Sequence, residues 1–312
     1  MTLALNTLTP SGMILTADSR QTYRNIAGMV RIGSDSVTKL FKLTEKVGVA
    51  IAGRAFLPDP NGTPKNMGYF IEEFRSGGID PAVTVKNIAQ NLNDYLAGIF
   101  VTKERESLKA QIADAVTKQG GTDLVYKAPD GNLQPYSFRD SAGQPKEDAG
   151  FFETVDLIVA GIDDERVGRA YNVHVPKGII LENDTVKTGV MWIGQTDVVQ
   201  RIILGYDSIG NNLSFVKEAL ARDPVQAGAE LAKLQYLINW GTMSLQDAID
   251  FNILITRTTE SIQRFSDGTV FAPGGITGVG GNIAVAAVLP DRGFVWVTKR
   301  QLRAEESAIE ID

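Results

Sequence analysis

Thr2 is the residue whose type and position most directly predict chemistry in this chain. We expect Met1 to be removed because the residue that follows it is small, which makes Thr2 the first residue of the mature protein. An N-terminal threonine carries a nucleophilic hydroxyl and a free α-amine, so nucleophile and base occur on one residue. An α-amine has a pKa of roughly 7.7–8.0 and accepts a proton near neutral pH. Thr2 therefore predicts acyl transfer through an ester on its Oγ atom.

A predicted hairpin brings a carboxylate close to this hydroxyl. Residues 3–8 and 13–17 are apolar-rich runs typical of strands, and Pro10-Ser11-Gly12 between them is a turn sequence. The second strand runs back toward the start of the chain. We therefore expect Asp18, at its end, to lie beside Thr2.

A second predicted hairpin supplies a lysine and a glycine. Residues 39–43 and 47–53 have the same design around the turn Thr44-Glu45-Lys46. Taken singly, Lys39 is typical of a solvated charge on a strand, and Gly53 is typical of a strand end. Taken independently, neither residue predicts a catalytic site.

The segment Ile14-Leu15-Thr16-Ala17-Asp18-Ser19-Arg20-Gln21-Thr22, together with the second hairpin, resembles the proteasome β-type subunits of the N-terminal-nucleophile hydrolases, including their bacterial homologues. The likeness is specific over residues 2–56, fair over 78–100 and 154–200, and weak in the C-terminal third. About five extra residues lie between the two hairpins, near Arg31-Ile32-Gly33-Ser34.

The resemblance implies a role for each matching residue. Thr2 would attack the substrate carbonyl, and Asp18 would pair with Lys39, whose charge lowers the proton affinity of the Thr2 hydroxyl and amine. The backbone N–H of Gly53 would stabilise the oxyanion. The residues expected to bind substrate are Arg20, Gln21, Thr22, Ile51 and Ala55.

Two parts of the family's site are altered in this chain. A serine–glycine pair would fall at Gly194-Gln195-Thr196, where Gln195 replaces the serine. An aspartate–serine–glycine cluster should follow the helix that ends near Phe265. The nearest match is Ser266-Asp267-Gly268, so Asp267 is our candidate for the remaining catalytic carboxylate.

Strands, helices, strands and helices follow one another along the chain, an order that suits a four-layer α-β-β-α sandwich of the α+β class. We expect one proteasome-like domain over residues 1–312, with extra segments near 57–65, 101–150 and 266–280. Residues 119–150, rich in Gly, Pro, Asp and Gln, are expected to form a long loop or hairpin excursion. Expected helices cover 66–76, a segment from near Pro81 to 96, 103–118, 196–205, 213–222, 224–239 and 244–263, and expected later strands cover 155–161, 170–175, 178–181, 283–289 and 294–298.

Composition narrows the class of protein. The chain has 312 residues, no cysteine and a formal charge of −6, which excludes thiolate chemistry and disfavours nucleic-acid binding. It lacks a signal-peptide pattern and any run of 18 apolar residues, so we expect a cytoplasmic protein without a membrane partner. Nothing in its motifs predicts a cofactor or a metal.

Three functions fit these observations. The first is a threonine endopeptidase that acts on peptides or unfolded proteins as a homo-oligomer, either a ring or a helical array. An ATPase is a candidate partner of such a particle. The second is an N-terminal-threonine ligase or amidase, in which an amine receives the acyl group or a small amide is cleaved. The third is a catalytically inactive shell subunit. Lys39 and Asp18 in register with Thr2 favour an enzyme over the third.

Overall fold

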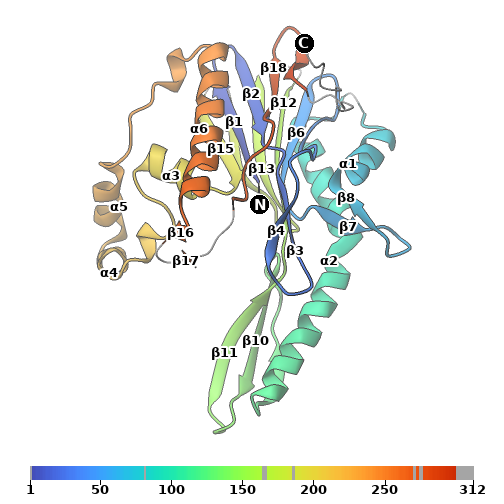
Figure 1. The fold of residues 1–312 in the computed structure, drawn as a ribbon, viewed down its shortest axis with the longest axis vertical. Helices are drawn as coiled ribbons and strands as arrows, with labels where there is room; N and C mark the ends of the chain where they lie inside the picture. Colours follow the sequence, from blue (N-terminus) through green and yellow to red (C-terminus); the bar gives the residue numbers. More distant parts are fainter. Residues whose placement is uncertain are drawn as a thin grey trace, which may run out of the picture.

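Two five-stranded antiparallel sheets pack face to face at the centre of the molecule (Figure 1). The computed structural model describes residues 2–80, 82–163, 167–184, 187–269, 272–273 and 277–299. One sheet has the order β15 (Gly189–Gly194), β1 (Leu3–Thr9), β2 (Gly12–Ala17), β18 (Ala284–Leu289) and β19 (Gly293–Thr298). The other has the order β14 (Gly178–Asp184), β13 (Gly168–Val175), β12 (Val155–Ile162), β6 (Val47–Gly53) and β5 (Leu40–Lys42).

Both predicted hairpins are confirmed. In the first, β1 pairs with β2 in a register that sets Ala4 opposite Ala17 and Thr9 opposite Gly12. All residues of both strands are buried, because Ala4 and Leu8 pack between the sheets while Leu3 and Leu5 pack on the opposite face of their sheet. Burial on both faces explains why the first strand lacks a simple polar–apolar alternation.

On one side, α1 (Met67–Ser76) and α2 (Val85–Lys118) pack in the largest apolar cluster. The side chain of Thr84 accepts a hydrogen bond from Asn87 N and caps the start of α2. The two helices expected on either side of residue 100 are one continuous helix of 34 residues. Its last turns bury Leu108, Ile112 and Val116.

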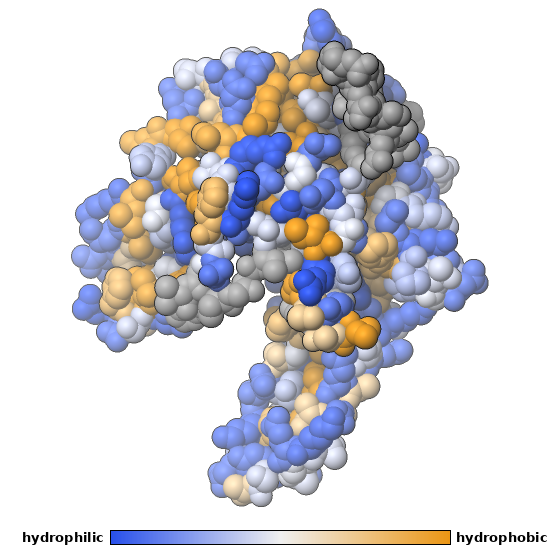
Figure 2. All heavy atoms as spheres, viewed as in Figure 1, coloured by the Kyte–Doolittle hydropathy of each residue, from blue (hydrophilic) through white to orange (hydrophobic). Residues whose placement is uncertain are grey.

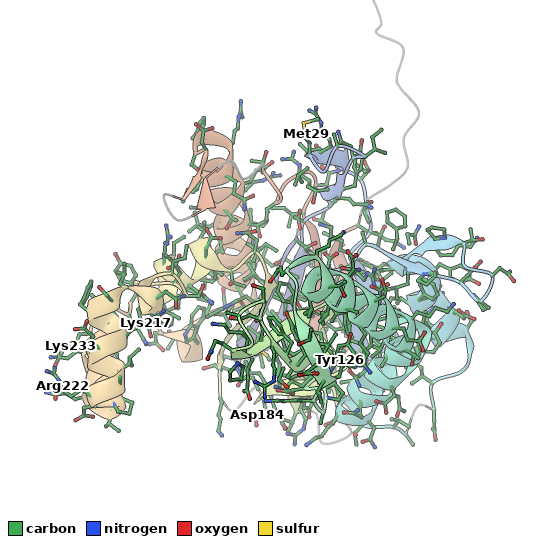
Figure 3. All side chains as sticks on the ribbon, turned by 90° about the horizontal axis from the view of Figure 1, so that it is seen from below. Met29, Tyr126, Asp184, Lys217, Arg222 and Lys233 are labelled. Carbon is green, nitrogen blue, oxygen red and sulfur yellow. The ribbon has the colours of Figure 1, made fainter. Side chains whose placement is uncertain are left out.

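On the other side, α6 (Leu245–Phe265) contacts β1 and β2 and packs with α3 (Asp197–Leu204). A capping box between Ser244 and Asp247 begins α6. The remaining helices, α4 (Ser214–Arg222) and α5 (Pro224–Ala232), bury one residue between them, Val216. Figure 3 shows this pair, marked by Lys217, Arg222 and Lys233, set apart from the rest of the chain.

The predicted four-layer α-β-β-α sandwich is wrong. The described residues form mainly antiparallel sheets, and the helices among them do not assemble into two covering layers. The second half of α2 runs beyond the central sheets, and α4 and α5 stand off from them (Figure 1). The reason is physical: α5 has no buried side chain, and the end of α2 buries its apolar residues against a separate, smaller sheet.

That smaller sheet lies within residues 119–150, where we expected a long loop or a hairpin excursion, and the structure shows the hairpin alternative. Strands β9 (Thr122–Tyr126), β10 (Leu133–Arg139) and β11 (Pro145–Phe151) form this sheet, and with the second half of α2 they make a projection that we call the arm (Figure 1). Figure 2 shows mostly hydrophilic residues on the visible face of the arm. The arm leads directly into β12, so its base lies next to the central sheets.

Two further hairpins lie in segments that the sequence pattern left irregular. The first pairs β3 (Gln21–Arg24) with β4 (Val30–Ser34) and contains the extra residues between Asp18 and Lys39. The second pairs β7 (Phe56–Pro58) with β8 (Pro64–Asn66) inside the predicted extra segment 57–65. The short strands β16 (Gly268–Thr269) and β17 (Ala272–Pro273) follow α6, and residues 270–271 and 274–276 of the extra segment 266–280 lie outside the described residues.

Candidate active site

Asp18 is held at the end of β2 by four hydrogen-bond donors. Its Oδ1 accepts from Leu3 N and Lys39 Nζ, each at 3.0 Å. Its Oδ2 accepts from Arg20 N at 3.1 Å and from Gly280 N at 3.0 Å. Because both oxygens are occupied, the carboxylate cannot rotate without breaking several bonds. Asp18 therefore fixes the start of β1, the exit of β2 and a distant glycine in one place.

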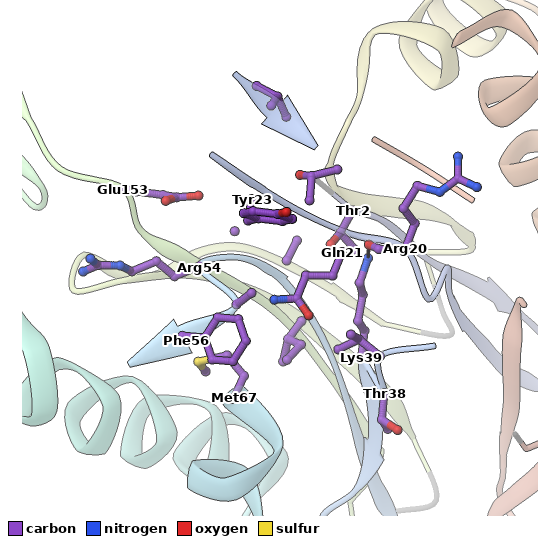
Figure 4. A pocket seen from close by; sticks show the side chains of 17 residues that line it. Thr2, Arg20, Gln21, Tyr23, Thr38, Lys39, Arg54, Phe56, Met67 and Glu153 are labelled. Atoms are coloured by element: carbon purple, nitrogen blue, oxygen red, sulfur yellow. Dashed lines mark hydrogen bonds between the residues drawn. The ribbon is translucent and has the colours of Figure 1, made fainter. Parts of the chain in front are cut away.

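Lys39 is the cation of this site. Its side chain is only 6% exposed, and its Nζ donates to Asp18 Oδ1 and to the carbonyl oxygen of Arg20. Burial lowers the pKa of Lys39, and the charge of Asp18 opposes that shift. Burial also raises the pKa of Asp18, and Lys39 with the N–H of Gly280 opposes it. Figure 4 shows the Lys39 side chain pointing toward Thr2.

Thr2 is buried and anchored through its backbone. Its residue is 4% exposed, and its carbonyl oxygen accepts a hydrogen bond of 2.6 Å from Gln195 N. The neighbouring Gly194 has a φ of +88°, and a Cβ atom there would lie 2.0 Å from the Thr2 oxygen. Only glycine fits this approach. Gln195 thus anchors Thr2 through its backbone N–H.

Thr2 lines a cavity of about 490 Å³, within the range of small-ligand sites. All of the predicted substrate-binding residues border it, from β3 on one side to the end of β6 on the other (Figure 4). They are Arg20, Gln21, Thr22, Ile51 and Ala55. The structure therefore gathers the predicted nucleophile, its lysine and these residues around one space.

Gly53, the predicted oxyanion donor, closes the cavity at the end of β6. It has a φ of +86°, and a Cβ atom there would lie 2.3 Å from the carbonyl oxygen of Thr154. In the antiparallel register Gly53 lies opposite Val155. Because glycine has no side chain, the backbone of Thr154 and the carbonyl of a bound substrate can both come close to the Gly53 backbone.

Arg20 is engaged within the protein. Its guanidinium contacts Asp35 through Nε at 2.6 Å and Nη2 at 3.0 Å, while Ser19 Oγ donates to the Asp35 carbonyl at 2.6 Å. Sequence reasoning missed Asp35, because its partner lies 15 positions earlier and no local pattern links the two. The Arg20–Asp35 pair positions the backbone of Arg20, whose carbonyl oxygen receives Lys39.

Asp267 does not join these residues. It is exposed in the turn between α6 and β16, and it is not among the residues that line the Thr2 cavity. Gly280, from a later segment, supplies the contact to Asp18 instead. The proposed removal of Met1 concerns a residue outside the described part of the chain.

No protein-family model matches this chain, and no curated protein shows significant sequence similarity to it. Within the described residues, no three His, Cys, Asp or Glu side chains cluster as metal ligands would. None of the helices in that part of the chain combines the length and apolar character needed to cross a bilayer.

Proposed function

We propose that this protein is an N-terminal threonine peptidase. The observation that carries the proposal is the placement of Thr2 beside the buried Asp18–Lys39 pair, on the wall of the cavity of about 490 Å³. Burying two charges costs free energy. Buried ion pairs in a cavity are therefore typical of functional sites, where their electric field acts on a reacting group. The resemblance of the first two hairpins to proteasome β-type subunits supports the same activity.

The proposed reaction needs only groups of this chain and the substrate. Thr2 Oγ attacks the carbonyl carbon of a peptide bond while the α-amine of the mature Thr2 takes the hydroxyl proton. The N–H of Gly53 donates to the developing oxyanion. The C–N bond then breaks, the proton passes to the leaving amine, and an ester remains on Thr2. Water attacks this ester, releases the new carboxyl end and restores the hydroxyl.

Lys39 acts on the nucleophile by its charge. A cation that points toward Thr2 favours the alkoxide over the hydroxyl and lowers the proton affinity of a neighbouring amine. Low exposure strengthens this effect, because little water screens the charge. Asp18 keeps the ammonium in place through Oδ1 while its Oδ2 is held by backbone N–H groups.

The wider assignments follow from the resemblance. We propose peptides or unfolded proteins as substrates, a homo-oligomer as the working form, and the cytoplasm as its place. Identical subunits in head-to-tail contact form either a closed ring or an open helical array. A partner ATPase would deliver unfolded chains to such a particle.

The test combines intact mass with activity. Protein from its native host is treated with a threonine-directed epoxyketone or boronate, and one adduct is expected on a chain that begins at Thr2. Thr2→Ala should take up no inhibitor and cleave no fluorogenic peptide while it stays folded. Thr63→Ala, a change on an exposed loop, is the matched control and should keep both properties.

Three outcomes would overturn the proposal. A retained Met1 removes the amine that the mechanism requires. Joining of two peptides without hydrolysis identifies a ligase. The absence of any adduct, cleavage or joining identifies a shell subunit.

A further inference from the structure

Thr2 also lines a second cavity, on the side facing the arm. This space of about 320 Å³ shares Thr2, Gly53 and Glu153 with the larger cavity. Its other walls come from the base of the arm, including Asn132 and Phe151, from the start of β12 and from the end of β15. The proposed nucleophile therefore stands between two adjoining spaces, each able to hold one flank of an extended substrate.

The two spaces differ in charge. The larger one is lined by three cations, and each is paired inside the protein: Arg20 with Asp35, Lys39 with Asp18, and Arg54 with Glu104 at 2.7 Å. The second has no Lys or Arg among its lining residues. Its carboxylates are Asp156, which lines this cavity alone of the two, and Glu153, which it shares with the larger cavity.

The two carboxylates are held differently. Asp156 lies 2.6 Å from His174 Nδ1 across the β12–β13 pair, which orients its side chain. The carboxylate of Glu153 is exposed and makes no hydrogen bond or ion pair with the described residues. Figure 4 shows it on the wall of the larger cavity, opposite the side occupied by Lys39. Glu153 is thus the anion available to a bound molecule at the junction of the two spaces.

We infer that the second cavity binds the leaving side of the substrate and prefers a cationic residue, lysine or arginine, directly after the cleaved bond. The inference rests on the proposed function, which puts the acyl side in the larger cavity beside Gln21, Ile51 and Ala55. An extended chain crossing Thr2 continues on the other side, toward Glu153. An ammonium or guanidinium there meets a carboxylate without displacing an internal partner.

The first experiment measures this preference in turnover. Three internally quenched peptides share an apolar acyl side and differ only in Lys, Gln or Glu after the scissile bond. Wild type should cleave the Lys peptide at least about threefold more efficiently than the Glu peptide in low salt, a scale typical of exposed ion pairs. The ratio should fall as salt is added.

In Glu153→Gln, the cleavage rates of the Lys, Gln and Glu peptides should become similar. Glu147→Gln is the matched control: it makes the same change on the arm, at a side chain that pairs with Lys127 and does not line the cavity. This control should keep the wild-type ratio. Equal rates in wild type, or an unchanged ratio in Glu153→Gln, would overturn the inference and leave the peptidase proposal intact.

A second measurement tests the inference by binding alone, without peptide cleavage. Fluorescent versions of the Lys and Glu peptides are bound to folded Thr2→Ala, and their affinities are compared by anisotropy. Tighter binding of the Lys peptide, lost when Glu153→Gln is added, supports the cationic site even if wild type cleaves nothing. Equal affinities for the two peptides would refute it.

Discussion

Replacing Lys39 by methionine separates a catalytic role of the buried pair from a purely structural one. Methionine keeps the long apolar stem and removes the ammonium that donates to Asp18 Oδ1 and to the Arg20 carbonyl. The Asp18 carboxylate, itself 1% exposed, would then face an apolar side chain. The variant therefore tests what an unpaired charge costs at this site.

The expected cost follows from the contacts that remain. Removing one partner of a buried ion pair typically costs about 3–5 kcal/mol. Asp18 would keep three backbone donors, from Leu3, Arg20 and Gly280, which stabilise its charged form. We therefore expect the lower end, about 3 kcal/mol near pH 8.

The cost should shrink as the pH falls. Burial already raises the pKa of Asp18 in the folded protein, and loss of Lys39 removes the largest opposing effect. A group whose folded pKa exceeds its unfolded pKa stabilises the fold at low pH and loses that contribution as the pH rises through the folded pKa. The free energy of unfolding of Lys39→Met should thus be closer to that of wild type at about pH 5 than at about pH 8.

Urea unfolding midpoints at the two pH values, together with peptidase rates, check this reasoning. Lys42→Met is the control, because Lys42 forms a solvated pair with Glu45 and should cost at most about 1 kcal/mol at either pH. Peptide cleavage by Lys39→Met should fall at least about a hundredfold at a temperature where the variant is folded. A cost equal to that of the control, or one independent of pH, would refute the electrostatic account. Full activity in the folded variant would refute the catalytic role.

Three further predictions concern the site, the core and assembly. Gly194→Ala should lower the free energy of unfolding by about 2 kcal/mol or more and impair inhibitor labelling, because the new Cβ would meet the Thr2 carbonyl. Its control is Gly28→Ala, at a φ of +76° in open space, which should cost only about 1 kcal/mol in the same denaturation assay. Leu92→Ala, at a fully buried position of α2, should cost about 2–5 kcal/mol, whereas Leu237→Ala, at a 98% exposed position, should stay within about 0.5 kcal/mol. Light scattering at micromolar concentration should show a particle larger than one chain, and a monomer would count against a proteasome-like assembly.

Local patterns predicted the elements closest to the site. Alternation of apolar runs with turn residues predicted the β1–β2 and β5–β6 hairpins, because strand and turn preferences act over a few neighbouring residues. Helical spacing likewise predicted α1 and α6 close to their observed bounds. It also predicted helix over residues 103–118, but not that this helix continues from the preceding one as α2. The three-stranded sheet against which the second half of α2 packs was not predicted.

What the sequence by itself determined is the set of candidate groups, Thr2, Asp18 and Lys39, and the short hairpins that carry them. Only the tertiary structure decided their surroundings. Gly280 reaches Asp18 across 262 positions of the chain, whereas Asp267, chosen by likeness to a motif, stays exposed. The second cavity likewise exists only because the base of the arm folds back beside Thr2. Such contacts depend on how sheets and helices pack, and packing is a property of the whole chain that no short segment encodes.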